Sequence, residues 1–273
     1  MAMIPYLEHP SITIFGHTIY AFGLMVALAI FVGLELVKRQ APRYGIDAED
    51  ASALAFWTIV CGLVGSHWFS ALAYYPEKVM ANPLELLKFW GSMSSFGGIM
   101  GGLIGAAVIL RLKRWPAQQA LRFVDMVAWA FPFAWLFGRF GCTLAHDHIG
   151  IESSAWIAVN FPDGPRLDLG LIEWLLTIPI AITYYLLRHK DRPAGFYIAL
   201  FFTLYGPIRI LLDSLRVEDA RYLGATPAQY VAAAFTLAGI IWLIQLRGKP
   251  AETSQTRRPE SAKVRGKKRN KRR

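Results

Sequence analysis

Seven apolar segments, each long enough to cross a bilayer as a helix, restrict the fold of this sequence more than any other feature. A transmembrane helix needs about 20 mostly apolar residues. Such segments occupy residues 18–37, 52–74, 95–112, 123–141, 169–187, 194–213 and 228–246. The 273-residue chain is also 55% hydrophobic, which is too apolar for an ordinary soluble domain. We therefore expect an all-α integral membrane protein with about seven transmembrane helices.

The basic residues are distributed unevenly between the two ends of these segments. Of the 29 Lys and Arg, 22 fall in the first, third and fifth connections and in the C-terminal region. Cytoplasmic loops of membrane proteins carry such an excess. The asymmetry predicts an N-terminus outside the cytoplasm and a cytoplasmic C-terminus.

The C-terminal residues differ in composition from the rest. We expect a transmembrane domain over residues 1–248 and a basic, disordered cytoplasmic tail over residues 249–273, because the tail is polar and has no apolar period. Attraction to anionic lipid of the cytoplasmic leaflet is the expected role of this tail. Nucleic acid is the less favoured partner, although the net charge is +10.

Several polar residues lie within the spans at one depth, toward the outer leaflet. Burying such side chains in lipid is costly, so they mark candidate functional sites. They are Tyr20, His67, Ser94, Ser95, Arg139, Glu173, Arg209 and Asp213. A single arginine near a span end can simply extend to the headgroups. Two arginines with two carboxylates indicate a shared polar cavity, and a guanidinium suits the phosphate of a phospholipid.

A second candidate group follows Arg139 in the segment CTLAHDHIG. His146, Asp147 or His148 could serve as a general base, because a neutral histidine has a pKa suited to this role. Metal ligation is the weaker interpretation, since the triplet lacks further spaced ligands. The alternative without a chemical role is a loop in which these side chains hydrogen-bond to the backbone. Cys142 is interpreted as a small buried side chain rather than a reactive thiol.

Glycine-rich segments begin the third span, with SSFGGIMGGLIG, and close the fourth, with GRFG. In membranes such runs usually permit close contact between helices. The alternative is that they let backbone N–H groups approach a ligand oxygen.

The order of several motifs resembles one family. GSMSSFGGIMGG, GRFGCTLAHDHIG, LGLIEWLL, LYGPIRILLDSLR and GATPAQY follow one another as in the phosphatidylglycerol–prolipoprotein diacylglyceryl transferases. The likeness runs from about Ile14 to Gln245. It implies a multi-pass enzyme of the bacterial inner membrane that uses no cofactor or metal. Such an enzyme moves the diacylglyceryl group from phosphatidylglycerol to the lipobox cysteine of a prolipoprotein and releases glycerol 1-phosphate.

The resemblance also implies roles for single residues. Arg139 is similar to the family's signature arginine, and Arg209 to the arginine of its YGxxR motif. Tyr20 and Glu173 resemble residues of the family's first and fifth spans, and Asp213 stands where glutamate is usual.

The sequence also departs from the family pattern. Phe96 occupies the histidine position of the usual GGMSFHGG, and His67 replaces a common arginine. Cys142, Ala145 and Asp147 stand where the signature GRxGNFxNxE has two asparagines and a glutamate. These departures indicate a diverged member of the family.

The expected reaction is an S-alkylation. A thiol with a pKa near about 8.5 must lose its proton before its sulfur attacks the glycerol carbon. Arg139 and Arg209 are expected to stabilise the leaving phosphate, and one residue of the His146–His148 segment replaces the missing base. The alternative is a non-catalytic or altered-specificity phospholipid-binding protein on the same fold.

Overall fold

The structure is a computed structural model that describes residues 3–251 except 16, 89–92, 218–220 and 222. For His17, Ser95, Phe96 and Pro227 it describes the backbone only. The elements group into two compact units, whose boundaries fall within helices α1 (Ala21–Gln40) and α5 (Ala117–Ala145). Unit 1 comprises Met1–Gly33 and Ala128–Glu252, and unit 2 contains Leu34–Val127. The predicted tail falls largely outside the described residues.

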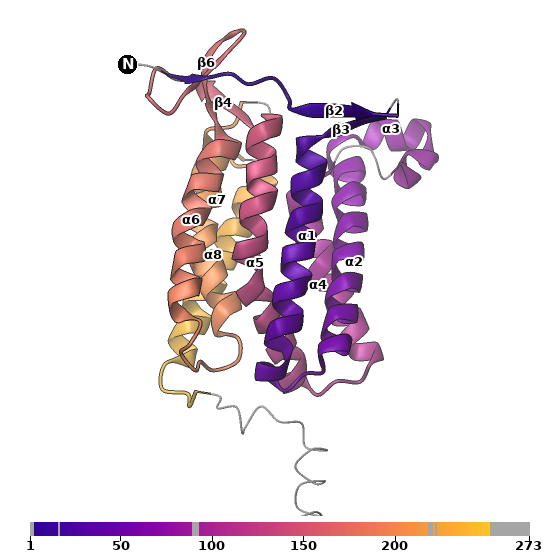
Figure 1. Cartoon of the computed structure of the whole chain (residues 1–273), viewed down its shortest axis with the longest axis vertical. Coiled ribbons are helices and arrows are strands. Elements are labelled where there is room, and N and C mark those ends of the chain that lie inside the picture. Colours follow the sequence, from indigo (N-terminus) through magenta and orange to yellow (C-terminus); the bar gives the residue numbers. More distant parts are fainter. Residues whose placement is uncertain (1–2, 16, 89–92, 218–220, 222, 252–273) are drawn as a thin grey trace, which may run out of the picture. The chain divides into compact units, whose positions relative to one another are not determined.

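Long helices occupy all seven predicted segments. Besides α1 and α5 they are α2 (Ala48–Tyr74), α4 (Ser95–Leu112), α6 (Leu169–Leu187), α7 (Phe196–Ser214) and α8 (Pro227–Leu246) (Figure 1). Six of the seven are long and apolar enough to cross a membrane, and the seventh, α4, supplies a shorter apolar helix over Gly97–Leu112. The expectation of an all-α integral membrane protein is confirmed.

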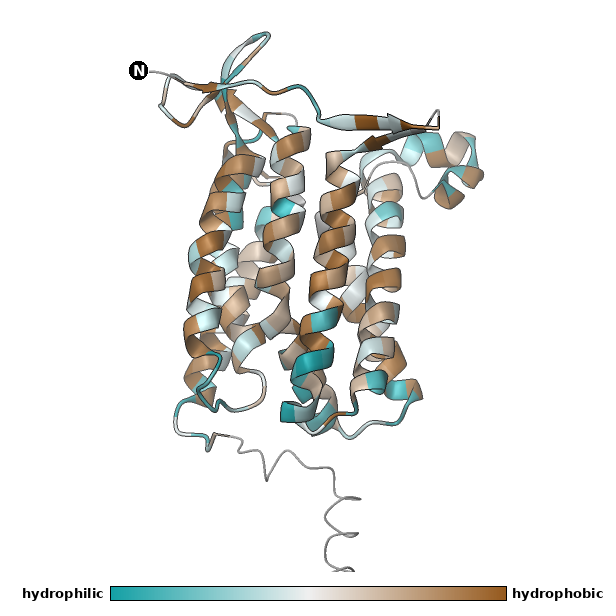
Figure 2. Ribbon diagram, in the orientation of Figure 1, coloured by the Kyte–Doolittle hydropathy of each residue, from teal (hydrophilic) through white to brown (hydrophobic). Residues whose placement is uncertain are grey.

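These helices expose apolar side chains instead of burying them. In the most apolar window of each of the six longer helices, only 6% to 39% of the residues are buried. Leu24, Phe31, Leu72, Leu211 and Ile244 are among the exposed large side chains, and Figure 2 shows hydrophobic colour along most of the length of the long helices. Such exposure would be unfavourable in water. The protein is therefore a multi-pass membrane protein.

Unit 2 is organised around α2 and α4, which contact each other through glycines. A Cβ atom added at Gly101 would lie 2.6 Å from the carbonyl oxygen of Cys61, and one added at Gly65 would lie 2.6 Å from the Cα of Gly101. The glycine-rich start of α4 thus supports close helix contact, the first of the two interpretations. Short helices connect the long ones: η1 (Ala41–Tyr44), α3 (Pro76–Ala81) and η2 (Pro83–Leu87).

Unit 1 contains two small sheets that the sequence did not predict. A four-stranded sheet has the order β1 (Ile4–Pro5), β5 (Val159–Phe161), β6 (Gly164–Asp168) and β4 (Ile149–Glu152). β2 (Ser11–Ile14) and β3 (His17–Tyr20) form an antiparallel hairpin. β4 to β6 connect the end of α5 to the start of α6 (Figure 1), so the larger sheet sets the position of the segment that follows Arg139.

Helices α7 and α8 pack closely along unit 1. A Cβ atom at Gly239 would lie 2.7 Å from the carbonyl oxygen of Ala199, and one at Gly206 would lie 2.9 Å from that of Ala232. The start of α8 is a capping box, in which Thr226 and Gln229 each bond the backbone of the other. This packing and this cap place Thr226 beside the end of α7.

Candidate functional site

A network of buried charged side chains joins α5, α6 and α7 within unit 1. Arg139 and Glu173 are each 1% exposed, and Asp213 is fully buried. Tyr205, Arg209 and Asp213 are spaced four residues apart on α7, which places them on one face of the helix. The network therefore combines one side chain from α5, one from α6 and a column of three from α7.

Glu173 is the centre of this network. Its Oε1 lies 2.9 Å from Nε of Arg139, although the geometry of this ion pair is not that of an aligned hydrogen bond. The hydroxyl of Tyr205 donates a hydrogen bond to Oε1 of Glu173 and accepts one from Arg139 over 3.4 Å. The guanidinium of Arg139 also lies 4.4 Å from the centre of the Trp135 ring, a cation–π distance. Arg139 is thus held on several sides.

The second half of the network surrounds Arg209. One guanidinium nitrogen donates to Glu173 Oε2 over 3.3 Å, and another lies 3.0 Å from Asp213 Oδ1. The hydroxyl of Thr226 donates to Asp213 Oδ2 over 2.9 Å. Two guanidiniums and two carboxylates balance in charge, as buried charges require. The side chain of Arg209 is 14% exposed, against 1% for Arg139, so Arg209 is the more accessible of the two to an anion.

The three residues of the H-D-H triplet have different environments. Nδ1 of His146 lies 2.6 Å from Asp168 Oδ2, and its Nε2 lies 3.0 Å from the carbonyl oxygen of Leu7. Burial raises the pKa of Asp168, although the bond with His146 opposes the rise. Because both ring nitrogens of His146 face oxygen atoms of the protein, this residue ties the N-terminal segment to the start of α6.

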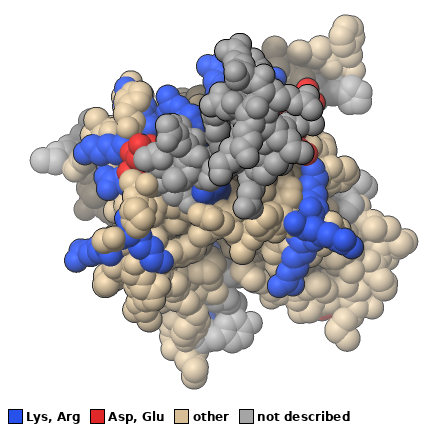
Figure 3. All heavy atoms as spheres, turned by 90° about the horizontal axis from the view of Figure 1, so that it is seen from below, with Lys and Arg blue, Asp and Glu red and all other residues tan. Residues whose placement is uncertain are grey.

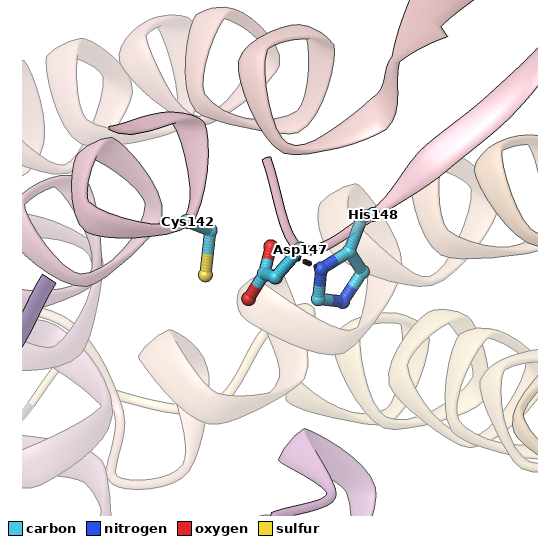
Figure 4. A group of neighbouring side chains, drawn as sticks. All are labelled: Cys142, Asp147 and His148. Carbon is cyan, nitrogen blue, oxygen red and sulfur yellow. Dashed lines mark hydrogen bonds and ion pairs between the residues drawn. The ribbon is translucent and has the colours of Figure 1, made fainter. Parts of the chain in front are cut away.

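Asp147 and His148 form a pair beside Cys142. Nδ1 of His148 is hydrogen-bonded to Asp147, and the potential ligand atoms of the three residues lie within 4.8 Å of one another (Figure 4). Burial lowers the pKa of His148 more than its bond with Asp147 raises it. Burial also acts to raise the pKa of Asp147, but the bond with His148 and the charges of His148 and Arg139 outweigh it, so this pKa is below its usual value. A neutral histidine beside an ionised carboxylate can take up a proton.

One guanidinium links this group to the network. Arg139 donates from one terminal nitrogen to Cys142 Sγ over 3.8 Å and from the other to Tyr205. The arginines of the network and the Cys142–Asp147–His148 group are therefore parts of one site.

The structure places the remaining predicted residues outside this buried network or does not describe them. Tyr20 ends β3 and is exposed. His67 is buried in α2 of unit 2, where Nε2 lies 2.9 Å from the carbonyl oxygen of Glu85. Ser95 is the first residue of α4, but its side chain lies outside the described part of the structure.

Sequence reasoning missed several residues of the site. Tyr205 and Thr226 complete the bonding of the two carboxylates, and Asp168 holds His146. Tyr205 could have been found from its spacing, since it lies one helical turn before Arg209. Thr226 could have been found from its T-x-x-Q capping pattern. For Asp168 no comparable pattern is present, because its partner is 22 residues away.

Comparison with known proteins supports the family resemblance that the order of motifs indicates. The sequence model of one family, prolipoprotein diacylglyceryl transferase, matches residues 10–245. The chain belongs to the prolipoprotein diacylglyceryl transferase family. Phosphatidylglycerol–prolipoprotein diacylglyceryl transferases are similar to it over most of their length. The protein of Symbiobacterium thermophilum is 24% identical over 94% of this chain and 99% of its own. The protein of a Janthinobacterium species is 29% identical over 84% of this chain and 92% of its own. The protein of Polynucleobacter asymbioticus is 29% identical over 89% of this chain and 97% of its own.

In this member of the prolipoprotein diacylglyceryl transferase family, both arginines of the network contact one carboxylate. Arg139 and Arg209 pair with the two oxygens of Glu173. Cys142 and Asp147, the other side chains near Arg139, lie next to this network.

Proposed function

We propose that this protein transfers the diacylglyceryl group of phosphatidylglycerol to the lipobox cysteine of a prolipoprotein in the bacterial inner membrane. The observation that supports the proposal is the Arg139–Glu173–Tyr205–Arg209–Asp213 network, buried in a chain that belongs to the transferase family. Because all five polar partners are present and joined, a non-catalytic lipid-binding role is not favoured.

Arg209 is the proposed ligand of the phosphate. When the bond between the glycerol carbon and the phosphate oxygen breaks, negative charge develops on the leaving group. A guanidinium fixed by two carboxylates, here Glu173 and Asp213, is already oriented and can stabilise that charge without rearrangement. Arg139 acts from inside the protein, where it positions Glu173 and adds positive potential.

The Asp147–His148 pair is proposed to help the acceptor thiol lose its proton. The pair lies beside Cys142, and Arg139 contacts both Cys142 and Tyr205. Arg139 therefore connects the proposed place of thiol activation to the network that holds Arg209. His146 is committed to Asp168 and Leu7 and is the weaker candidate for this role.

We also propose that the larger sheet of unit 1 faces the outside of the cell. Within unit 1, α6 runs from this sheet to a connection that carries the exposed Lys190, and α8 ends near the exposed Arg247 and Lys249. Within unit 2, the exposed residues Lys38, Arg39, Arg43, Arg111 and Lys113 surround the end of α1, the start of α2 and the end of α4. Figure 3 shows Lys and Arg on the face seen from below. Such clustering is typical of a cytoplasmic side.

Complementation tests the proposed function. The gene is expressed in bacteria depleted of their own transferase, and a reporter lipoprotein is analysed by mass spectrometry. We expect the diacylglyceryl thioether on its N-terminal cysteine, and we expect none with the variant Arg209→Ala. An unmodified reporter in cells that contain normal amounts of the folded protein would refute the proposal.

A further inference from the structure

The group formed by Cys142, Asp147 and His148 has the composition of a metal site. We propose that these three residues bind a zinc ion and leave its fourth position open to the thiol of the acceptor. The metal site stands on its own geometry, whereas the role of the acceptor thiol rests on the proposed function.

The ligand atoms already converge. Sγ of Cys142, a carboxylate oxygen of Asp147 and a ring nitrogen of His148 lie within 4.8 Å of one another, and Figure 4 shows Asp147 between the other two side chains. Zinc bonds to sulfur, nitrogen and oxygen are about 2.0–2.3 Å long, so ligands of one tetrahedral ion are about 3–4 Å apart. Small rotations of these side chains would accommodate an ion.

The backbone holds the three residues in place. Cys142 lies in the last turn of α5, and the carbonyl oxygen of His148 accepts a hydrogen bond from the amide of Leu169 over 2.9 Å. His146 has a φ of +47°, in the left-handed region, and its ring is fixed by Asp168. The turn that carries Asp147 and His148 back toward Cys142 is therefore defined at both ends.

The types of ligand favour zinc over other cations. Thiolate, imidazole and carboxylate are the usual zinc ligands, whereas magnesium and calcium take oxygen. Three protein ligands with one open position are typical of catalytic zinc sites, since structural sites use four. The Cys142 thiolate and the Asp147 carboxylate would balance the charge of the ion. Arg139, which is already neutralised by Glu173, would donate a hydrogen bond to the ligand sulfur.

A zinc ion at this group would also provide a means of ionising the acceptor. A thiol that coordinates zinc is deprotonated, so the acceptor would need no separate histidine base.

The reaction needs no added oxidant or reductant. A zinc ion held by Cys142, Asp147 and His148 would lower the pKa of the acceptor thiol, whose proton would pass to solvent, so that Asp147 and His148 would assist ionisation as ligands rather than as a base. The sulfur forms a bond to the glycerol carbon, and the bond between that carbon and the phosphate oxygen breaks. The electron pair leaves with that oxygen as glycerol phosphate, and the product is a thioether, a neutral and weak ligand that dissociates from the ion.

Metal analysis of the purified full-length protein tests the site. Protein extracted in detergent without chelator should contain about one zinc ion per chain. Cys142→Ser, Asp147→Asn and His148→Gln should each lower the affinity for added zinc by at least about tenfold. Cys61→Ser and His189→Gln are matched controls outside the group and should bind zinc as the parent does. Equal zinc in the parent and all three ligand variants would overturn the proposal.

Cobalt substitution tests the open position. Co²⁺ in the parent should give a thiolate charge-transfer band in the near ultraviolet that is absent from Cys142→Ser, and a lipobox peptide should intensify it, whereas its Cys→Ser analogue should not. A parent that transfers diacylglyceryl groups without bound metal would overturn the zinc inference and leave the proposed function intact. A parent that binds zinc and the peptide thiol but transfers nothing to it would retain the site and refute the proposed function.

Discussion

The two arginines of the network differ in exposure, and this difference separates their roles. Arg139 is 1% exposed, and its guanidinium contacts only protein groups among the described residues. They are Glu173, Tyr205, Trp135 and Cys142. Arg209 shares two carboxylates and is partly exposed. Removing one member of a buried ion pair leaves a charge without compensation. Replacement of Arg139 should therefore affect folding as well as activity.

Lysine substitutions separate binding geometry from charge. Arg209→Lys keeps the charge but loses the planar fork, and we expect transfer to fall about 100-fold with little change in thermal stability. Arg139→Lys should also destabilise the protein by about 3 kcal/mol, because Glu173 and Tyr205 lose a partner. Transfer to a lipobox peptide in phosphatidylglycerol vesicles and the unfolding midpoint in detergent measure these effects.

Arg166→Lys is the control for both variants, because Arg166 bonds Asp163 and Glu152 at the surface of the sheet. It should retain activity and stability. If Arg209→Lys transferred as fast as Arg166→Lys, the role of Arg209 as a phosphate ligand would be wrong.

The pH dependence of transfer distinguishes His148 from His146. An acceptor thiol with an unperturbed pKa of about 8.5 is mostly protonated at neutral pH. His148→Ala should be slow at neutral pH and should recover part of its rate as the pH rises toward 9, about where the thiol ionises unaided. His146→Ala should lower the amount of folded protein and leave the pH profile of the remainder unchanged. A pH recovery in His146→Ala alone would assign the role to His146.

At the scale of elements, the ends of helices decide the geometry of the site. The N-terminal cap of α8 bonds the buried carboxylate at the end of α7, since Thr226 both accepts from the amide of Gln229 and donates to Asp213. Asp168 has a similar double role, because it caps α6 and holds His146. Charged residues of the site are thus oriented by the residues that begin the next helix.

Thr226→Val tests this coupling between a helix cap and the site. Valine has the same shape but no hydroxyl, so Asp213 loses a hydrogen bond and α8 loses its cap. We expect a loss of about 1–2 kcal/mol of stability together with a lower transfer rate, since Asp213 orients Arg209. Thr226→Ser keeps the hydroxyl and should behave as the parent does. Equal melting temperatures and rates for the two variants would contradict the proposed role of this hydroxyl.

At the scale of the whole molecule, the distribution of charge indicates which side of the membrane the site is closer to. The residues of the H-D-H triplet connect to the larger sheet through β4, and the basic connections lie at the other ends of the unit 1 helices. The site therefore lies nearer to the side that we propose to be outside the cell. A prolipoprotein cysteine exported across the membrane would meet the site on that side.

Accessibility labelling tests this orientation. A membrane-impermeant maleimide added to intact cells should label Ser154→Cys, which lies in the exposed connection after β4, and should not label Lys190→Cys until the cells are opened. The parent chain, whose Cys61 and Cys142 are both partly buried, provides the background. Labelling of Lys190→Cys alone in intact cells would reverse the proposed topology.

Much of this protein is determined by its sequence. Apolar segments of bilayer length must form helices, because a backbone in lipid has to satisfy its own hydrogen bonds, and the observed helices occupy all seven segments. Polar residues placed in such segments must find partners, so Arg139, Glu173, Arg209 and Asp213 could be selected before their contacts were known. The glycines that let α2 and α4 approach could be identified because glycine runs in membrane spans usually permit close contact between helices.

Only the tertiary structure decided how the selected residues are paired. His146 and His148 are two positions apart, yet one holds Asp168 and the other faces Asp147 and Cys142. The short strands β4 to β6 turn the chain between α5 and α6, and three to five residues carry too little periodicity to reveal such a turn. Contacts between residues distant in sequence depend on that turn, which is why Cys142 appeared as a filler in the sequence and as a potential metal ligand in the structure.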